Sequence, residues 1–470
     1  MSTRVAIEVP ADGLAMPTRI WAVMVLASGT ALSVLVSSIA NVALPTIAQD
    51  LNITPAESIW VVNIYQLVVT SLLLPLAGLG DIVGYRRVYL SGLALFVLGS
   101  LACSLSNSFA ALTVARAIQG VGGAGIMCVS SALLRSVYPA RLLGRGIGIA
   151  AMVVATSSAA GPAVASAILS VADWPWIFAI NVPVGLVAVV IGLRVLPMNE
   201  LSQTRFDTPG AILNALTLGL FILGLEGIGH NQTASTIAIE LTFAIVIGYF
   251  FVRRQMRQPK PLLPLDLLRL PIFSLSVSTA FCSFMAQVLA MVSLPFYLQE
   301  VVGLSAVDAG LQLTAWPIAV MAVAPAAGVL ADKFSAGVLG TMGLVVSAIG
   351  LALLGFSSME THGSGFSWDM SWRLAICGAG FALFQQPNTR VIVGSAPKER
   401  AGGASGLLAT TRLSGQTTGA AVAAIVFSVS ASGGYGEALK VAMLVALLAA
   451  IISALRLVPG VTIKNDLSVD

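Results

Sequence analysis

Hydrophobic residues form runs of roughly 18–25 positions, separated by short polar segments, along nearly the whole chain. A helix of about 20 apolar residues suffices to cross the hydrocarbon core of a bilayer. The pattern therefore predicts an all-α polytopic membrane protein with about fourteen transmembrane helices. They are expected near residues 20–44, 57–80, 87–106, 109–134, 145–170, 175–196, 209–229, 234–252, 272–295, 307–330, 337–358, 372–394, 403–430 and 438–458.

Two connections between these runs are longer than the others, and they divide the helices into six, two and six. A related sequence ends the second run of each six-helix half, P-L-A-G-L-G-D at 75–81 and P-A-A-G-V-L-A-D at 325–332, as expected for parallel repeats. The expected organisation is a cytoplasmic segment 1–19, an N-terminal six-helix bundle 20–196, a cytoplasmic linker 197–208, two inserted helices 209–252, a second linker 253–271, a C-terminal six-helix bundle 272–458 and a cytoplasmic tail 459–470.

Composition supports this class, because 57% of the residues are hydrophobic, only 9% are charged and the mean hydropathy is +0.95. Lysine and arginine gather in alternate loops, and the positive-inside rule then places both termini in the cytoplasm. The expected location is the cell membrane, as a multi-pass protein of a bacterial inner membrane. The net charge of +4 is scattered through short loops, so no nucleic-acid partner is expected. Residues 1–18 contain no apolar stretch of a signal peptide, and the first span is expected to direct insertion.

Several chemistries lack the residues that they need. The four cysteines lie inside predicted spans, which argues against a disulfide framework, and the two histidines stand alone in loops, which argues against a metal site. No nucleophile–base cluster and no phosphate-binding G-x-x-x-x-G-K-[ST] is found, so neither an enzyme nor a primary pump is expected, and no cofactor. These residues are Cys103, Cys128, Cys282, Cys377, His230 and His362.

One permanent charge, Arg116, lies inside the apolar run 109–134. At the bilayer centre an arginine costs about 2.5–3.5 kcal/mol on insertion scales, so it normally faces a protein interior or a water-filled cavity. Gln119 shares its helix face at i+3. We favour a cavity role over a side chain that extends to the interface from a helix end. The glycines that follow form G-x-G-x-x-G, but no strand precedes them, so they predict close helix packing and not dinucleotide binding.

Several motifs in the same order resemble the major facilitator superfamily, and within it the fourteen-span drug:proton antiporters of the QacA/EmrB type. The turn G-L-G-D-I-V-G-Y-R-R at 78–87 is similar to the family's loop between its second and third helices, and L-x-x-x-R-x-x-Q-G-x-G at 112–122 matches its fourth-helix pattern. Trp60, Tyr65 and the stretch 176–183 also look family-like. The spacing of the antiporter signature is kept by Gly148, Ser157, Gly161, Pro162, Ala165 and Ser166, with small residues at three of its five glycine positions.

The resemblance implies roles for two of these motifs. In the turn, Asp81 is expected to pair with Arg86 and Arg87 and to act as a conformational latch between neighbouring helices. Asp332 occupies the related turn of the second half. The alternative is that these charges form a solvated face and serve as an orientation signal. In the antiporter helix, small residues allow backbones to approach, and Pro162 removes a helical hydrogen bond, so that Gly161 and Pro162 are candidates for a hinge. In the family this helix marks exporters.

The chain departs from the family in its first span, where Val36 holds the place of an intramembrane aspartate in the run 35–45. Ser37, Ser38 and Asn41 of this run are candidates for cavity lining, together with Trp60 and Tyr65. An arginine does not deprotonate at ordinary pH, so proton coupling needs another group. The carboxylates nearest to membrane depth are identified as Glu226 and Asp308, and the alternative is that both are interfacial. With few carboxylates and a fixed positive charge, the cavity is expected to disfavour dications.

Together these features predict a secondary active transporter that uses protons to export amphipathic drugs or toxic small molecules, as in multidrug efflux and antibiotic resistance. Substrate, protons and the lipid bilayer are the expected partners of a monomer. The transport and coupling residues are expected to be Arg116, Gln119, Glu226 and Asp308, with alternating access by rocking of two bundles. The alternatives are a dedicated exporter or an uptake carrier of one metabolite, or a membrane sensor that does not transport.

Overall fold

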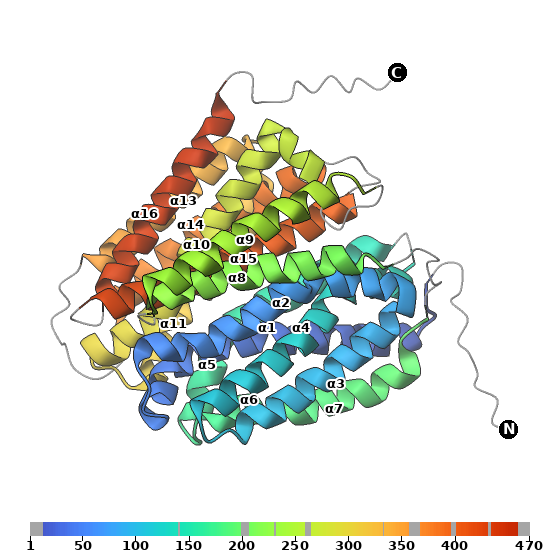
Figure 1. Cartoon of the computed structure of the whole chain (residues 1–470), viewed down its shortest axis with the longest axis horizontal. Helices are drawn as coiled ribbons and strands as arrows, with labels where there is room; N and C mark the ends of the chain where they lie inside the picture. The colour runs from blue at the N-terminus through green and yellow to red at the C-terminus, as the bar shows by residue number, and fades with distance from the viewer. Residues whose placement is uncertain are drawn as a thin grey trace. The chain divides into compact units, whose positions relative to one another are not determined.

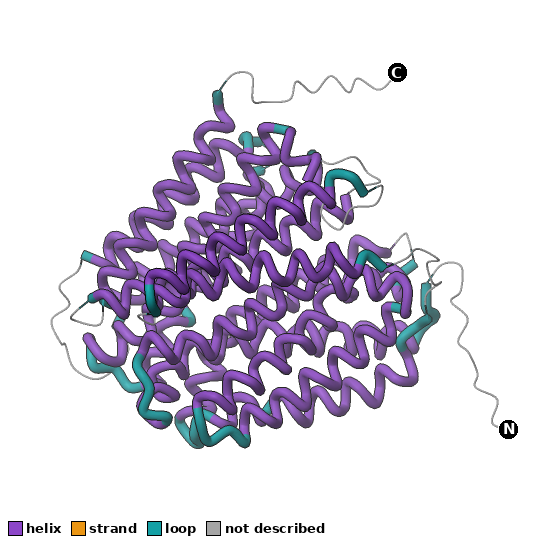
Figure 2. Tube along the Cα trace, in the orientation of Figure 1, coloured by secondary structure: helices purple, strands orange, loops and turns teal. Residues whose placement is uncertain are grey.

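The computed structural model describes residues 13–139, 142–198, 206–229, 232–258, 265–331, 333–356, 367–395, 401–430 and 434–458. Helices make up almost all of these residues, and short loops join them (Figures 1 and 2). The helices are α1 (Thr18–Asp50), α2 (Pro55–Val83), α3 (Tyr85–Ser104), α4 (Phe109–Val137), α5 (Leu143–Leu169), α6 (Pro175–Ala179), α7 (Asn181–Val195), α8 (Thr208–Gly229), α9 (Ala234–Gln255), η2 (Leu265–Arg269), α10 (Pro271–Phe296), η3 (Tyr297–Val301), α11 (Ala306–Leu313), α12 (Ala315–Leu330), α13 (Ala336–Gly355), α14 (Trp368–Gly394), α15 (Ala401–Val429), α16 (Tyr435–Ala454) and η5 (Leu455–Leu457).

The chain forms two compact units, Met1–Gly219 and Leu220–Asp470, and the boundary falls within α8. Unit 1 contains α1 to α7 and the first half of α8. Unit 2 contains the second half of α8, α9 and the helices from α10 onward. The finer division into six, two and six helices stays a prediction.

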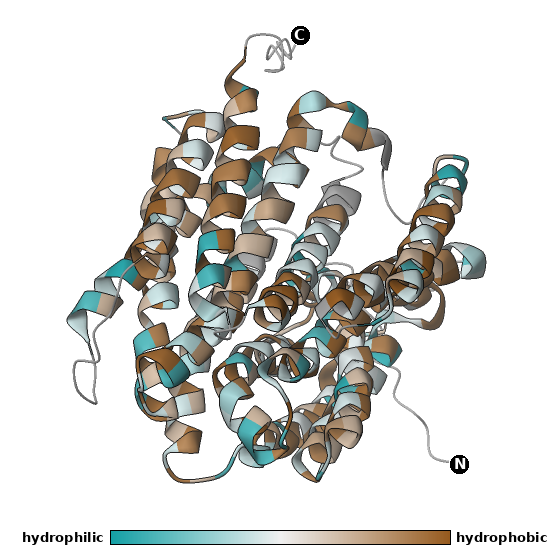
Figure 3. Ribbon diagram, turned by 60° about the vertical axis from the view of Figure 1, so that its left-hand side comes forward, coloured by the Kyte–Doolittle hydropathy of each residue, from teal (hydrophilic) through white to brown (hydrophobic). Residues whose placement is uncertain are grey.

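Within the described residues, twelve helical segments are long and apolar enough to cross a membrane. Apolar colours dominate most helices in Figure 3, and polar colours concentrate near the turns. Helical structure covers each of the fourteen predicted ranges, but α14 and α15 are not among the twelve. Asp369, Arg373 and Arg390 make α14 more polar, and α15 carries Arg412 with several serines and threonines. The all-helical membrane fold is confirmed, and the count of fourteen is not.

Two of the predicted spans differ from the structure because each is broken into two helices. The range 175–196 contains α6 and α7, which meet at Ile180, and the range 307–330 contains α11 and α12, which meet at Thr314. A proline lacks the N–H group and its ring clashes with the carbonyl four residues earlier. Pro183 lies four residues after the end of α6 and Pro317 lies four residues after the end of α11. A proline at the same offset thus accompanies both breaks.

Glycines allow α3 and α4 to approach at backbone distance in unit 1. A Cβ atom added at Gly122 would lie 2.3 Å from the Phe96 nitrogen, and one at Gly99 would lie 2.6 Å from the Gln119 Cα. Unit 2 repeats the arrangement between α13 and α14, where a Cβ at Gly343 would lie 2.6 Å from the Gly380 oxygen. The G-x-G-x-x-G sequence thus lies within a continuous helix whose glycines contact neighbouring helices.

Most of the large side chains of α9 are exposed and apolar. The exposed fraction reaches 72% for Ile245 and 59% for Tyr249. The first half of α8 is held within unit 1, where the Asn214 side-chain amide donates to the Ser71 carbonyl at 2.9 Å. In a soluble protein such an apolar surface would be an aggregation hazard, whereas lipid solvates it.

Candidate functional site

Arg116 lies on α4, which begins where the Ser108 hydroxyl accepts a hydrogen bond from the Ala111 N–H at 3.3 Å. Seven residues of helix separate Phe109 from Arg116, a rise of about 11 Å. The side chain of Arg116 has no exposed surface. The guanidinium is therefore enclosed by protein well inside an apolar helix.

A chain of hydrogen bonds joins Arg116 to three helices of unit 1. Its Nε donates to the Val61 carbonyl of α2 at 2.7 Å, and its Nη1 donates to Gln119 Oε1 at 2.5 Å. Gln119 Nε2 donates in turn to Ser100 Oγ on α3 at 2.7 Å, and Ser100 Oγ donates to the Phe96 carbonyl at 2.8 Å. Gln119 thus links the arginine of α4 to α3, as its position on the same helix face predicts.

Two aromatic rings cover the guanidinium. Its central carbon lies 4.5 Å from the Tyr65 ring centroid and 5.6 Å from the Phe178 ring centroid. A desolvated cation–π contact of this kind contributes about 2 kcal/mol. The Tyr65 hydroxyl donates to the Ser33 carbonyl of α1 at 3.2 Å, and Gly123 leaves the space that Tyr65 occupies.

No carboxylate forms an ion pair with Arg116 among the described residues, so its charge is balanced only by neutral dipoles and ring faces. Its Nη2 atom is buried and has no hydrogen-bond partner in the described part of the chain. This nitrogen can donate to a water or substrate oxygen that reaches it. Arg116 is fully buried in this structure, and its role in a transport cavity stays a prediction.

A second buried arginine, Arg456, was not identified from the sequence. It lies in η5 at the end of α16, is 3% exposed, and donates from Nη1 to Asn388 Oδ1 at 2.7 Å and to Ser276 Oγ at 3.1 Å. Its Nη2 donates to the Ser453 hydroxyl. The group joins α10, α14 and α16 of unit 2. The sequence did not indicate this site for two reasons. Arg456 lies at the end of the last apolar run, where an arginine at the membrane interface is common, and its partners Ser276 and Asn388 are far from it in the sequence.

The predicted cavity-lining residues occupy different environments. Tyr65 belongs to the Arg116 network, whereas Ser37, Ser38 and Trp60 are half-buried on α1 and α2 and do not take part in the hydrogen bonds or ring contacts of Arg116. Asn41 is also half-buried, and its Oδ1 is a buried atom without a hydrogen-bond partner among the described residues. Only Tyr65 of these five is brought to the arginine.

The antiporter helix α5 packs against α1 through small residues. A Cβ added at Gly161 would lie 2.2 Å from Ser38 Oγ and 2.4 Å from Ser38 Cβ. Ser157 and Ala165 are buried, and the Ser166 hydroxyl donates to the Pro162 carbonyl at 3.0 Å. The side-chain environment of Gly148 lies outside the described residues. The helix is continuous through Pro162, so a hinge there stays a prediction.

Gly161→Leu is expected to abolish transport while the protein still reaches the membrane, because the new side chain cannot fit between α5 and Ser38. Gly219→Leu on α8 is the matched control, since nothing lies within 4 Å of a Cβ added there. Flux into vesicles and the amount of protein in the membrane fraction are measured together. Parent-like flux in Gly161→Leu would contradict a requirement for close α1–α5 contact.

The turn between α2 and α3 contains hydrogen bonds and no ion pair among the described residues. Asp81 Oδ1 accepts a hydrogen bond from the Tyr85 hydroxyl at 2.5 Å, the Arg86 Nη2 donates to the Leu193 carbonyl, and the Arg87 Nη1 donates to the Val83 carbonyl at 3.3 Å. Gly84 has a φ of 107°, which favours glycine at this turn. Asp332 lies outside the described residues. The expected pairing of Asp81 with the two arginines is absent here, and a latch stays a prediction.

The two predicted coupling carboxylates are not brought to Arg116 in the described structure. The Glu226 side chain lies outside the described residues. Asp308 is half-buried in the first turn of α11, where Oδ2 accepts from the Ser305 hydroxyl at 2.7 Å. Asp308 thus takes part in a local helix cap, and a role in proton coupling stays a prediction.

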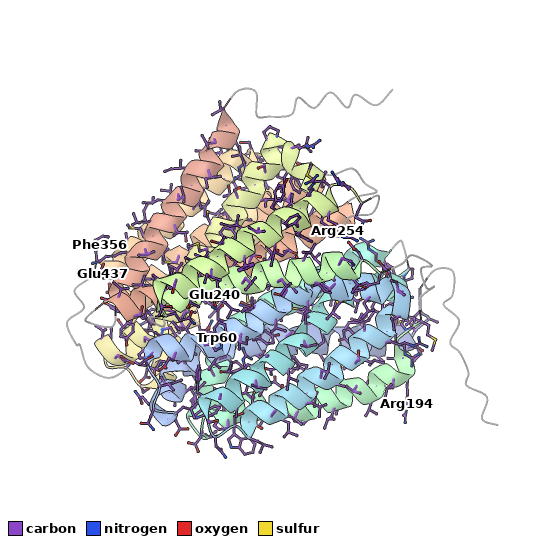
Figure 4. The ribbon with its side chains drawn as sticks, in the orientation of Figure 1. Trp60, Arg194, Glu240, Arg254, Phe356 and Glu437 are labelled. Carbon is purple, nitrogen blue, oxygen red and sulfur yellow. The ribbon has the colours of Figure 1, made fainter. Side chains whose placement is uncertain are left out.

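A third carboxylate, Glu240, lies inside the apolar helix α9 and was overlooked in the sequence (Figure 4). Six residues separate it from Ala234, a rise of about 9 Å. Its Oε2 atom is buried and has no hydrogen-bond partner among the described residues. A Cβ added at Gly224 of α8 would lie 3.5 Å from Glu240 Cβ, so Glu240 lies beside α8. The signal that identified Arg116, one charge within an apolar run, would have found it.

Apolar helices arranged in two units, with charged groups buried inside them, define a polytopic membrane protein that can bind or move polar species. The sequence also matches the family model described as Major Facilitator Superfamily over residues 26–420. The chain belongs to this superfamily of membrane transporters.

Three curated relatives extend over most of the chain. An uncharacterized transporter of Escherichia coli (strain K12), YebQ, is 52% identical over 96% of this chain and 98% of its own length. A riboflavin transporter of Clostridioides difficile (strain 630), RibZ, is 32% identical over 83% of this chain and 85% of its own. A tetracenomycin C resistance and export protein of Streptomyces glaucescens is 33% identical over 89% of this chain and 78% of its own.

The fold also resembles solved transporters. A POT family transporter, crystallised in complex with 5-aminolevulinic acid, superposes with a TM-score of 0.72 at 16% identity, and the match covers 97% of this chain and 99% of that one. The likeness supports the fold alone.

Proposed function

We propose that this chain is a proton-coupled exporter of amphipathic small molecules, related to the fourteen-span drug:proton antiporters. The observation that carries the proposal is the enclosed guanidinium of Arg116, because a charge held in an apolar helix is costly and is normally functional. Export is supported by the antiporter pattern on α5 and by the relative whose name includes resistance and export.

The proposal includes fourteen spans, with α14 and α15 crossing the membrane inside unit 2. They contain 27 and 29 residues, more than enough for a bilayer, since about 20 suffice. In α14, Arg373 and Asp369 form an ion pair at 2.7 Å near the helix start, and Asn388 bonds to the buried Arg456. An even number of spans with basic alternate loops places both termini in the cytoplasm.

A carrier of one metabolite is the second candidate, since the riboflavin transporter is 32% identical over 83% of this chain. Flux measurements separate the two candidates. Everted membrane vesicles are energised with an inward-acid pH gradient and given a panel of drugs and riboflavin. Proton-dependent uptake of several unrelated amphiphiles supports the exporter. Proton-dependent movement of riboflavin alone, into or out of preloaded vesicles, supports the metabolite carrier. No proton-dependent movement of any compound would contradict both.

The buried arginines lead us to expect that the transporter discriminates among substrates by their charge. Arg116 and Arg456 are buried, the Arg412 Nε is buried without a partner, and none has an ion pair among the described residues. A dication bound close to such groups needs compensating carboxylates. Val36 on α1 is fully buried and apolar where relatives of the antiporter type carry an aspartate.

We expect the parent to confer resistance to neutral and monocationic biocides and little to divalent ones, and Val36→Asp to raise divalent resistance at least a few-fold. Minimal inhibitory concentrations of the parent, Val36→Asp and Val36→Asn provide the measurement, and the asparagine variant controls for polarity without charge. Strong divalent resistance in the parent would contradict this selectivity.

A further inference from the structure

A cleft of about 330 Å³ lies between α10 and α15 within unit 2. Among the described residues, no acidic or basic side chain lines it. Both helices contribute hydroxyl groups, and α10 adds a phenyl ring and a thiol. The lining residues are Val277, Ser278, Phe281, Cys282, Thr410, Thr411 and Ser414.

Glycines of α15 bring the two helices together next to the cleft. Farther along α15, a Cβ added at Gly415 would lie 2.6 Å from the Phe281 oxygen, and one at Gly419 would lie 2.4 Å from the Met285 oxygen. Backbone contact at these glycines holds α15 against α10. Ser414, which lines the cleft, directly precedes Gly415, and Phe281 takes part in both the contact and the lining.

Three hydroxyls of the cleft differ from their neighbours in their hydrogen bonds. Serine and threonine inside helices usually donate to the carbonyl three or four residues earlier. Thr279 does so to Leu275 at 2.7 Å, and Thr417 does so to Leu413 at 2.9 Å.

Ser278, Thr411 and Ser414 make no such bond and no other hydrogen bond to a described residue. Thr410, the fourth hydroxyl, donates to the Gly406 carbonyl at 3.0 Å and retains lone pairs that can accept. The cleft therefore presents three hydroxyls that are not engaged by described residues and one that can still accept.

We propose that this cleft binds an uncharged, hydroxyl- or carbonyl-bearing ring of the transported molecule. The free hydroxyls donate to or accept from its oxygens, and Phe281 contacts its ring face. The absence of lining charge excludes an ionic group, which would be left uncompensated. The volume lies at the lower end of the range for small-molecule sites, so it accommodates one part of a larger amphiphile. The inference rests on the proposed transport of amphipathic molecules.

Cys282 provides a direct report of occupancy, because it is half-buried in the cleft, whereas Cys103 and Cys377 are buried. The full-length protein in liposomes is treated with N-ethylmaleimide, and alkylation of each cysteine is quantified by mass spectrometry. Chloramphenicol and p-nitrophenyl β-glucoside are the neutral probes, and ethidium and benzoate are the charged ones. We expect at least one neutral probe to slow alkylation of Cys282 and not that of Cys128, and neither charged probe to do so.

Ser278→Ala, Thr411→Val and Ser414→Ala are each expected to raise the half-protecting concentration by about twofold to tenfold, the cost of one hydrogen bond. Thr279→Val is the matched control, since this neighbour of Ser278 bonds to its own helix, and it should protect like the parent. Failure of both neutral probes to protect, an unreactive Cys282, or equal effects of Thr279→Val would overturn the inference.

This labelling needs no proton gradient, so its result is independent of export. Protection without proton-dependent flux would keep the cleft as a binding site and remove the exporter, whereas flux without protection by either neutral probe would keep the exporter and remove the cleft as its neutral-ring site.

Discussion

Replacing Arg116 with alanine is expected to reduce the transport rate at least about tenfold, which corresponds to a rise of about 1.4 kcal/mol in the activation free energy of the rate-limiting step. The variant is still expected to be made and inserted into the membrane. The guanidinium links α2, α3 and α4 through Val61 and Gln119 and is stacked on Tyr65. Its loss leaves Gln119 Oε1 without this donor and breaks the link between the helices. Flux in energised vesicles is measured with the membrane content of each variant.

Arg116→Lys is expected to fail as well. An ammonium group is a compact point charge, and it cannot reproduce a planar fork that bonds to two acceptors while lying on a ring. Arg194→Ala is the matched control because Arg194 is an exposed arginine of the same unit (Figure 4). Parent-like flux in Arg116→Ala or Arg116→Lys would show that neither the charge nor its geometry is needed.

A structural role can be separated from a transport role. Replacing buried ion pairs with apolar side chains of similar size is often neutral or stabilising, because the desolvation cost of the charges is removed, and Arg116 bears that cost without an ion pair among the described residues. Arg116→Met is therefore expected to keep or raise the thermal midpoint of the purified protein and still lose flux. If flux in the variants simply follows their thermal stability, Arg116 serves the fold and not transport.

The apolar pattern predicted the helices well because a membrane imposes a simple condition on length and hydrophobicity. The pattern did not predict the breaks near Pro183 and Pro317. A proline in the sequence does not by itself predict a break, because the helix that contains Pro162 is continuous. A proline removes the same hydrogen bond in each case. Whether the helix breaks depends on neighbouring contacts that a single sequence does not reveal.

Part of the Arg116 site was predictable from the apolar pattern and helical spacing. Its charge inside an apolar run and Gln119 on the same face were readable from helical spacing. Ser100, Val61 and Phe178 come from three other helices, and their proximity depends on the glycine contacts that set how closely α2, α3 and α4 pack. Arg456 shows the limit, because its partners Ser276 and Asn388 are 180 and 68 residues away.

We expect Glu240 to be the coupling carboxylate in a chain where Val36 holds the place of the family's aspartate. Its buried Oε2 has no hydrogen-bond partner among the described residues, and it lies beside α8. The second half of α8 carries one other ionisable residue, Glu226, and the basic residues Arg253 and Arg254 lie at the far end of α9. A coupling group must exchange a proton during the cycle, which an arginine cannot do at ordinary pH, so carboxylates are the candidates.

Glu240→Gln is expected to reduce pH-gradient-driven accumulation to the level of vesicles without the protein, because glutamine has the shape of the protonated acid and cannot release a proton. Exchange of labelled for unlabelled substrate at equal concentrations needs no net proton movement, so it should continue. Glu226→Gln is measured in parallel as the other carboxylate of this helix pair. Full accumulation in Glu240→Gln with loss in Glu226→Gln would assign the proton to Glu226, and full accumulation in both variants would place the coupling group outside α8 and α9.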